Sequence, residues 1–200
     1  RDRCLTAEIL RYALTARIII LTVYYLYSTE EVTMPQRVEL NTPAPDFSLA
    51  DWQGQMVRLS DFRGRNHVVL VFNRGFVCPF CRRLMAQLRQ GYAEFTARGA
   101  QIIVVGPEGA AAFRDYWQRE KLPFIGLPDA KHSVLKLYGQ EVNLFNLGRM
   151  PAQVIVDRQG IVRYAHYGHA MSDIPSNAEL LAVLDELNAR ESEPSGDQGK

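Results

Sequence analysis

The sequence predicts a single α/β domain, a three-layer sandwich with a mixed central sheet and an N-terminal β-hairpin. Near-continuous apolar runs, which are typical of strands buried on both faces, alternate with segments of helical periodicity. The alternation ends in an antiparallel hairpin followed by an amphipathic helix. Elements in this order pack as helices on the two faces of a sheet.

The strands are predicted by apolar runs and by the turn residues between them. Gly54 supplies the turn of the N-terminal hairpin, and Arg158-Gln159-Gly160 supplies the turn of the C-terminal one. His67, at the start of a buried strand, is expected to face solvent. The expected strands are residues 47–49, 56–59, 67–72, 101–105, 153–157 and 161–164.

The helices are predicted by apolar residues at helical spacing. One helix is expected to begin at Pro79 and to close at Gly99, where a left-handed cap is needed. Further helices are expected at 110–120, 134–138 and 180–187.

Composition limits the function classes. The chain has 200 residues, 47% hydrophobic and 22% charged, with a net charge of +1, as in a soluble globular domain. Lys and Arg are scattered, so we expect no nucleic-acid partner. Two of the three cysteines lie in one C-x-x-C, which is no framework of structural disulfides and indicates a reducing, cytoplasmic location.

Residues 1–33 differ from the rest of the chain. They combine a basic start with an apolar stretch at 18–27 that is shorter than the roughly 20 residues of a membrane span. We expect this leader to lie upstream of a true start at Met34, with the domain at 34–190 and a disordered tail at 191–200. We therefore expect no membrane association. A genuine leader would instead imply a membrane anchor or export.

The C-x-x-C lies where a buried strand gives way to a helix. Cys78 is placed to be the N-cap and Pro79 the first helical residue. Phe80 follows, and Cys81 lies one turn after Cys78. A helix N-terminus stabilises a thiolate, and the two sulfurs are close enough to form a disulfide. Arg74, four residues earlier, is either a second donor to the thiolate or a surface residue. Cys78 and Cys81 are thus the candidate catalytic residues for thiol–disulfide redox chemistry.

A zinc site is the alternative use of such cysteines. His166 and His169 would have to complete it, but they follow a distant strand into a loop. We therefore expect no metal.

Four segments in the same order resemble the alkyl hydroperoxide reductase / thiol-specific antioxidant family, the peroxiredoxin-like proteins of the thioredoxin superfamily. The resemblance covers about residues 40–188. It implies a thioredoxin fold and a peroxidatic cysteine that attacks a hydroperoxide to give a sulfenic acid, which a second thiol resolves. The segments are residues 44–49, 59–64, 74–81 and 154–160.

The chain departs from that family at two positions. Counted from Phe72, the family register places Cys81 at the peroxidatic position and Cys78 where the family has Thr. Pro151 stands where the family has Arg, and Arg149 is expected to supply that charge. A proline at this position resembles the thioredoxin proline, which is usually cis and packs beside the disulfide. Which cysteine attacks the peroxide stays open.

Three functions compete. The first is a peroxidase that reduces hydrogen peroxide or organic hydroperoxides through a Cys78/Cys81 dithiol–disulfide cycle. The second is a thioredoxin-like reductase of protein disulfides, and the third is a redox-regulated binding protein. For the enzymes we expect no cofactor, because electrons come from an external thioredoxin-, glutaredoxin- or glutathione-type reductant. Assembly into a homo-oligomer stays open.

Overall fold

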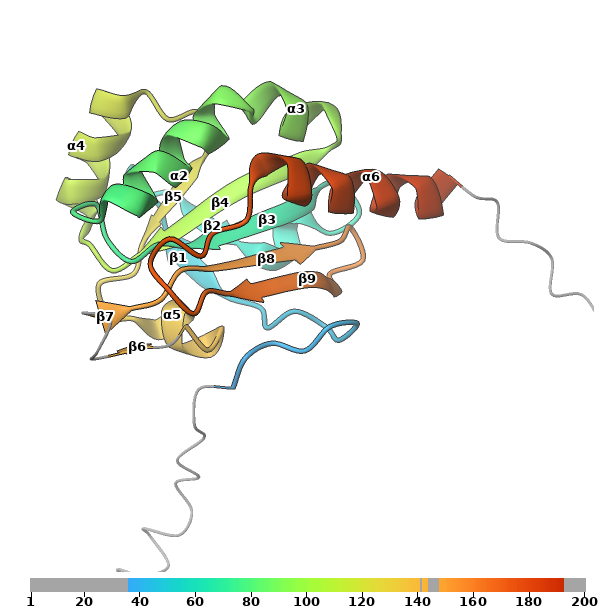
Figure 1. Cartoon of the computed structure of the whole chain (residues 1–200), viewed down its shortest axis with the longest axis horizontal. Coiled ribbons are helices and arrows are strands. Elements are labelled where there is room, and N and C mark those ends of the chain that lie inside the picture. The colour runs from blue at the N-terminus through green and yellow to red at the C-terminus, as the bar shows by residue number, and fades with distance from the viewer. Residues whose placement is uncertain (1–35, 141, 144–147, 193–200) are drawn as a thin grey trace, which may run out of the picture. The chain divides into compact units, whose positions relative to one another are not determined.

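A five-stranded sheet forms the centre of the chain (Figure 1). The structure, a computed structural model, describes residues 36–140, 142–143 and 148–192. The strand order is β5-β4-β3-β8-β9, with β3, β4 and β5 parallel and β8 antiparallel to both neighbours. The mixed central sheet is therefore confirmed. The strands are β3 (His67–Phe72), β4 (Ala100–Gly106), β5 (Ile125–Pro128), β8 (Ala152–Val156) and β9 (Val162–Tyr167).

Helices cover one face of the sheet, where Val69 and Val71 of β3 pack against them. Their apolar side chains form a continuous core with alternate residues of the strands, as the twofold periodicity of a strand requires. Figure 1 shows α2, α3 and α6 lying along this face. These helices are α2 (Pro79–Gln90), α3 (Tyr92–Ala97), α4 (Ala110–Glu120) and α6 (Asn177–Ser192).

The opposite face is covered by smaller elements. Val68, Leu70 and Phe72 of β3 point to this side and pack under the N-terminal segment and α5. The buried carboxylate of Asp129 accepts hydrogen bonds from several main-chain N–H groups at the start of α5, which fixes that short helix. The elements are the hairpin β1 (Ser48–Ala50) and β2 (Met56–Arg58), the 3-10 helix η1 (Leu59–Phe62), α5 (Ser133–Leu137), and the pair β6 (Val142–Asn143) and β7 (Gly148–Arg149).

The prediction of one long helix from Pro79 to Gly99 is wrong in one respect, because the helix breaks at Gly91 into α2 and α3. The amide of Asn177, at the start of α6, donates to the Gln87 carbonyl over 2.7 Å. A Cβ on residue 91 would lie 2.5 Å from that amide nitrogen, so the break leaves room for α6 to dock. Gly99 ends α3 with φ +67°, as predicted.

His67 is fully buried, so the expectation that it faces solvent is wrong. The C-terminal part of α6 covers this end of β3, and His67 Nε2 lies 3.3 Å from the side-chain oxygen of Asn188. Burial lowers the pKa of His67, and the positive charge of Arg158 acts in the same direction. Helix α6 continues to Ser192. The leader at 1–33 and residues 193–200 of the expected tail lie outside the described residues.

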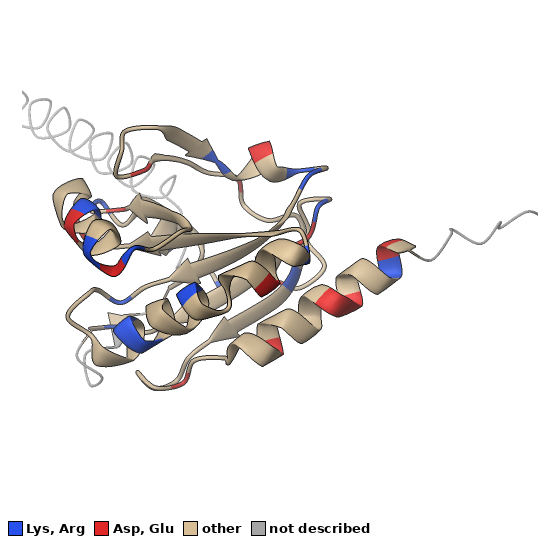
Figure 2. Ribbon diagram, turned by 90° about the horizontal axis from the view of Figure 1, so that it is seen from above, with Lys and Arg blue, Asp and Glu red and all other residues tan. Residues whose placement is uncertain are grey.

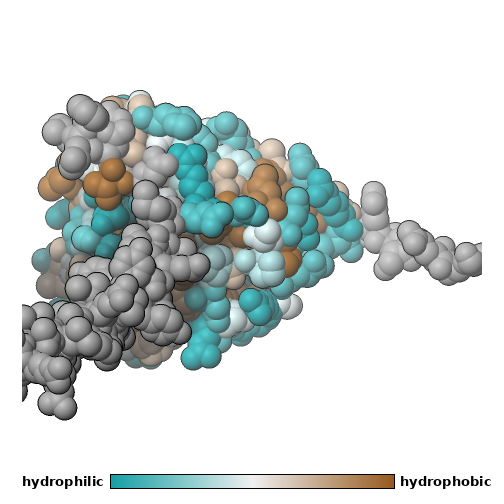
Figure 3. Space-filling model, turned by 90° about the horizontal axis from the view of Figure 1, so that it is seen from below, coloured by the Kyte–Doolittle hydropathy of each residue, from teal (hydrophilic) through white to brown (hydrophobic). Residues whose placement is uncertain are grey.

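Within the described ranges, no helix has both the length and the apolar character needed to cross a membrane. Seen from below, the coloured surface is mostly hydrophilic and carries separate hydrophobic patches (Figure 3).

Trp117 of α4 packs directly on β5, and this contact yields a stability prediction. The ring nitrogen donates to the Phe124 carbonyl over 2.7 Å, and a Cβ on Gly126 would lie 2.5 Å from two ring carbons. Gly126→Ala is therefore expected to lower the free energy of unfolding by about 1–3 kcal/mol, the usual cost of overpacking. Urea titration measures this change. Gly109→Ala, with open space around the added methyl group, is the control, and equal losses in the two variants would contradict the packing explanation.

Candidate active site

The loop between β3 and α2 presents the C-x-x-C, and its main chain is held by internal hydrogen bonds. The side-chain oxygen of Asn73 accepts from Gly75 N over 3.1 Å, while Asn73 N donates to the Val105 carbonyl over 2.8 Å. Gly75 has φ +138°, a conformation that favours glycine, and its carbonyl accepts from Cys78 N. The loop therefore delivers Cys78 in a defined position at the end of the parallel strands.

Phe76 anchors the same loop to α4. Its N–H donates to the Glu108 carboxylate over 2.6 Å, at the turn between β4 and α4. Its ring stacks on Tyr116 with centroids 4.3 Å apart and meets Phe113 edge-on at 4.9 Å. Val77, the next residue, is 94% exposed. The loop is thus fixed on its inner side and open to solvent immediately before Cys78.

The start of α2 has the predicted form. Cys78 is the N-cap with extended backbone angles, Pro79 opens the helix, and Arg82 N donates to the Cys78 carbonyl over 3.1 Å. Both cysteines carry free thiols and are buried, Cys78 being 8% exposed and Cys81 1%. Of the two, Cys78 is therefore the more accessible to a reactant from solvent.

The two thiols differ in acidity. Burial by itself raises the pKa of Cys78, but hydrogen bonds from the N–H and thiol of Cys81, the N–H of Phe80 and the guanidinium of Arg74 together lower that pKa below its ordinary value. Burial raises the pKa of Cys81 to about 12, and the negative charge on Cys78 adds to the increase. Cys78 is thus the more acidic thiol of the pair and the one that ionises first.

Arg74 answers the question left open by the sequence, because its side chain reaches the sulfur. Its Nη1 lies 3.5 Å from Cys78 Sγ, and its Nε donates to the carbonyl of Arg149 at the end of β7. The main-chain N–H of Arg74 also faces the sulfur of Cys81. One residue therefore contacts both members of the pair.

Arg149 and Pro151 do not lie as expected. The carbonyl of Arg149 holds Arg74, but its guanidinium is half-buried, and charge interactions place it near Asp129 and His132 rather than at the sulfur. The expected cis peptide at Pro151 is wrong, since the described residues contain no cis bond. In the trans form the chain enters β8 directly, and the Pro151 carbonyl accepts from Gly168 N over 2.9 Å.

Two residues that support this site were missed by the sequence interpretation. Gln140 is 3% exposed, and its amide nitrogen lies 2.9–3.2 Å from the carbonyl oxygens of Phe72, Asn73 and Met150, which joins the end of β3 to the start of β8. Glu108 fixes Phe76, as described above. Glu108 follows a buried parallel strand, and the general rule that sites form at the carboxyl ends of such strands would have pointed to it. No sequence signal marks Gln140.

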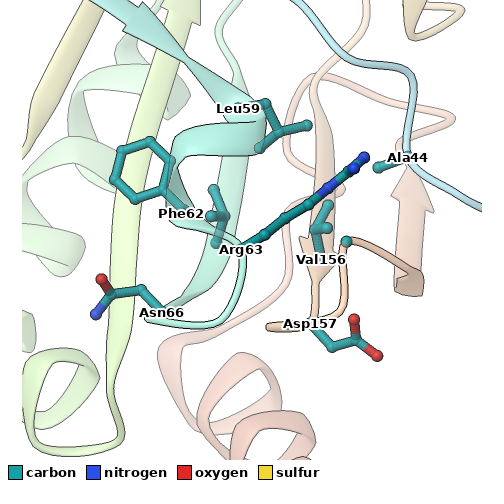
Figure 4. A pocket seen from close by; sticks show the side chains of 9 residues that line it. Ala44, Leu59, Phe62, Arg63, Asn66, Val156 and Asp157 are labelled. Atoms are coloured by element: carbon teal, nitrogen blue, oxygen red, sulfur yellow. The ribbon is translucent and has the colours of Figure 1, made fainter.

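The described residues hold no cluster of three or more metal-binding side chains. His166 instead pairs with Asp173 at 3.0 Å, and the N–H of His169 donates to the same carboxylate. A small pocket occurs far from the cysteines, where β3 begins and β8 ends (Figure 4). Arg63 extends across it toward Ala44, and the remaining cavity is about 10 Å³, which is at most the space of one water molecule.

A thioredoxin-like sheet that presents an acidic, N-capping cysteine and a buried second thiol defines a dithiol oxidoreductase. Residues 40–165 match the AhpC/TSA family. The chain belongs to that family, as the sequence predicted, and the membership favours a thiol-dependent peroxidase over the two alternatives.

The relatives include a peroxiredoxin and a thiol-disulfide oxidoreductase. Peroxiredoxin Q, chloroplastic, from Oryza sativa subsp. japonica is 31% identical over 153 residues, which are 76% of this chain and 69% of that protein. Thiol-disulfide oxidoreductase ResA from Geobacillus kaustophilus (strain HTA426) is 31% identical over 143 residues, 71% of this chain and 75% of that protein. The crystal structure of peroxidoxin BcpB from Mycobacterium tuberculosis has a TM-score of 0.65 at 20% identity, covers 76% of this chain and 98% of that one, and so shares the fold.

Arg74 is predicted to keep Cys78 ionised. Arg74→Gln removes the cation and is expected to raise the pKa of Cys78, because the thiolate loses a charge-assisted hydrogen bond. A loss of about 1.5 kcal/mol would slow the reaction with peroxide at neutral pH about tenfold. Thiolate absorbance followed against pH gives the pKa, and stopped-flow mixing gives the rate. Arg58→Gln, at an exposed position of β2, is the control. An unchanged absorbance profile in Arg74→Gln would assign Arg74 to loop structure alone.

Proposed function

We propose that this chain reduces hydroperoxides with Cys78 as the attacking thiolate and Cys81 as the resolving thiol. The observation that supports this assignment is the opposite displacement of the two pKa values, lowered at Cys78 and raised to about 12 at Cys81. The thiolate is the nucleophile in peroxide chemistry, so the more acidic and more exposed sulfur, that of Cys78, reacts first.

The proposed cycle has two steps on the protein. The Cys78 thiolate attacks one oxygen of the hydroperoxide, the O–O bond breaks, and the departing alkoxide or hydroxide takes a proton from water. Cys78 is left as a sulfenic acid without charge, so the charge that raised the pKa of Cys81 is gone. Cys81 then loses its proton and attacks Sγ of Cys78, which forms the disulfide and releases water.

This assignment differs from the family register, which places Cys81 at the peroxidatic position. Cys81 is 1% exposed, whereas Cys78 is the N-cap residue of α2 and contacts Arg74. We infer that the nucleophile has moved one helical turn, to the position where the family has Thr. In the family register an arginine at the position of Pro151 supports the peroxidatic cysteine. In this chain Arg74 takes that role.

The remaining components of the proposal come from outside the chain. Electrons are supplied by an external thiol reductant, so the cycle needs no bound cofactor. The cytoplasmic location and a homo-oligomeric state stay predictions; the rice relative is chloroplastic.

A disulfide reductase is the second candidate, and the similarity to ResA favours it. The described residues beside Cys78 offer little for pairing with an extended substrate chain. The carbonyls of Arg149 and Met150, which precede β8, already accept from Arg74 and Gln140. A hydroperoxide needs no such pairing, so this arrangement favours the peroxidase.

Single-cysteine variants test the order of the two sulfurs. Cys81→Ser is expected to form a stable sulfenic acid on Cys78 at a rate close to that of the unmodified chain. Cys78→Ser should lose the peroxide reaction by about a thousandfold or more, as expected when a nucleophile is removed. Stopped-flow mixing with hydrogen peroxide, followed by sulfenic-acid trapping and mass spectrometry, measures both.

Cys4→Ser is the control, since that cysteine lies outside the domain and should leave the reaction unchanged. Detection of the sulfenic acid on Cys81 alone would contradict the proposal and identify Cys81 as the peroxidatic cysteine, as the family register has it. If the reduced protein reacts with hydrogen peroxide no faster than a free thiol does, but reduces insulin disulfides, the chain is a disulfide reductase and not a peroxidase.

A further inference from the structure

The surface around Cys78 carries positive charge that nothing in the described structure neutralises. Arg82 and Arg83 are exposed on the first turns of α2, directly after the C-x-x-C, and neither forms an ion pair within the described residues. Arg82 lies four residues after Cys78, which places it on the same side of the helix. In Figure 2 the N-terminal end of α2 is blue, whereas the acidic residues of α6 lie further along the molecule.

Helix α4 lies next to this surface and does not neutralise its positive charge. The guanidinium of Arg119 lies 5.2 Å above the ring of Tyr116 and is paired with Glu120 at 3.1 Å. The charges of Glu120, Arg82 and Arg119 all act on the Tyr116 hydroxyl, which places Arg82 near this helix. The acidic side chain that contacts the loop, Glu108, lies on its inner side and is bound to Phe76. The uncompensated charge therefore belongs to Arg82 and Arg83.

We propose that the thiol that regenerates the Cys78–Cys81 disulfide is a small molecule bearing carboxylate groups, of which glutathione is an example, and that Arg82 and Arg83 select it. This inference rests on the proposed function, because only a cycle that closes through the disulfide needs an external thiol. The carbonyls of Arg149 and Met150 already accept hydrogen bonds from Arg74 and Gln140, which leaves less capacity there to pair with an extended protein partner. A carboxylate on a small thiol that approaches Cys78 would meet the exposed guanidinium of Arg82, one helical turn further on, with Arg83 next to it in the chain.

The chemistry balances with two such thiols. One thiolate attacks Sγ of Cys78, the accessible sulfur, and the S–S bond breaks to release Cys81, which takes up a proton. A mixed disulfide on Cys78 remains. A second thiolate attacks the outer sulfur of that mixed disulfide and expels the Cys78 thiolate, whose lowered pKa makes it a good leaving group. The products are the dithiol protein and the disulfide of the small thiol.

The test compares small thiols that differ in charge. The protein is oxidised to the disulfide with diamide, the reagent is removed, and reduction is followed by alkylation and mass spectrometry. The probes are 3-mercaptopropionate (anionic), 2-mercaptoethanol (neutral), cysteamine (cationic) and glutathione. Each rate constant is divided by the value for the same thiol with a neutral reference disulfide, which removes differences in intrinsic nucleophilicity.

The two anionic thiols are expected to react about tenfold faster than cysteamine at low salt, and the difference should shrink at high salt. The variant Arg82→Gln/Arg83→Gln should lose this preference. The control Arg65→Gln/Arg190→Gln removes the same net charge far from Cys78 and should keep it. Equal normalised rates for all four thiols, or an unchanged preference in the Arg82/Arg83 variant, would overturn the proposal. Peroxide takes no part in the measurement, so its outcome is independent of the peroxidase assignment.

Discussion

Cys78 is nearly buried and yet has a lowered pKa, and the arrangement of the site follows from reconciling these two properties. Removing a charge from water opposes ionisation, so the thiolate needs donors that are already in place. The helix start supplies main-chain N–H groups, Cys81 supplies a thiol, and Arg74 supplies a cation. The first two lie within the C-x-x-C segment, whereas Arg74 must be held by a part of the fold that lies elsewhere in the sequence.

That requirement explains why the residues around the loop are so extensively tied down. Gln140 joins the end of β3 to the start of β8, so the Arg149 carbonyl that holds Arg74 stays at a fixed place relative to Cys78. On the other side, Glu108 and the ring of Tyr116 hold Phe76. Side chains that never touch a reactant thus define the position of the donors, and the donors define the acidity of the sulfur.

The sequence predicted features whose causes are local. The buried strand at 67–72, the cap at Cys78 and the hairpin turn at Gly54 depend on residues within a few positions of each other, and all three occur. The break at Gly91 depends on Asn177, and the burial of His67 depends on the docking of α6. Neither can be read from a short window of sequence, because their partners are brought together by the sheet.

The contact between Arg74 and the Arg149 carbonyl spans 75 positions along the chain. A ribosome therefore releases both cysteines well before it synthesises the residue that holds their cation in place. Strand β8, which pairs with β3 and sets the entry to the site, is made later still. In the growing chain Cys78 thus lacks the fixed contact with Arg74, and this part of its activation belongs to the completed fold.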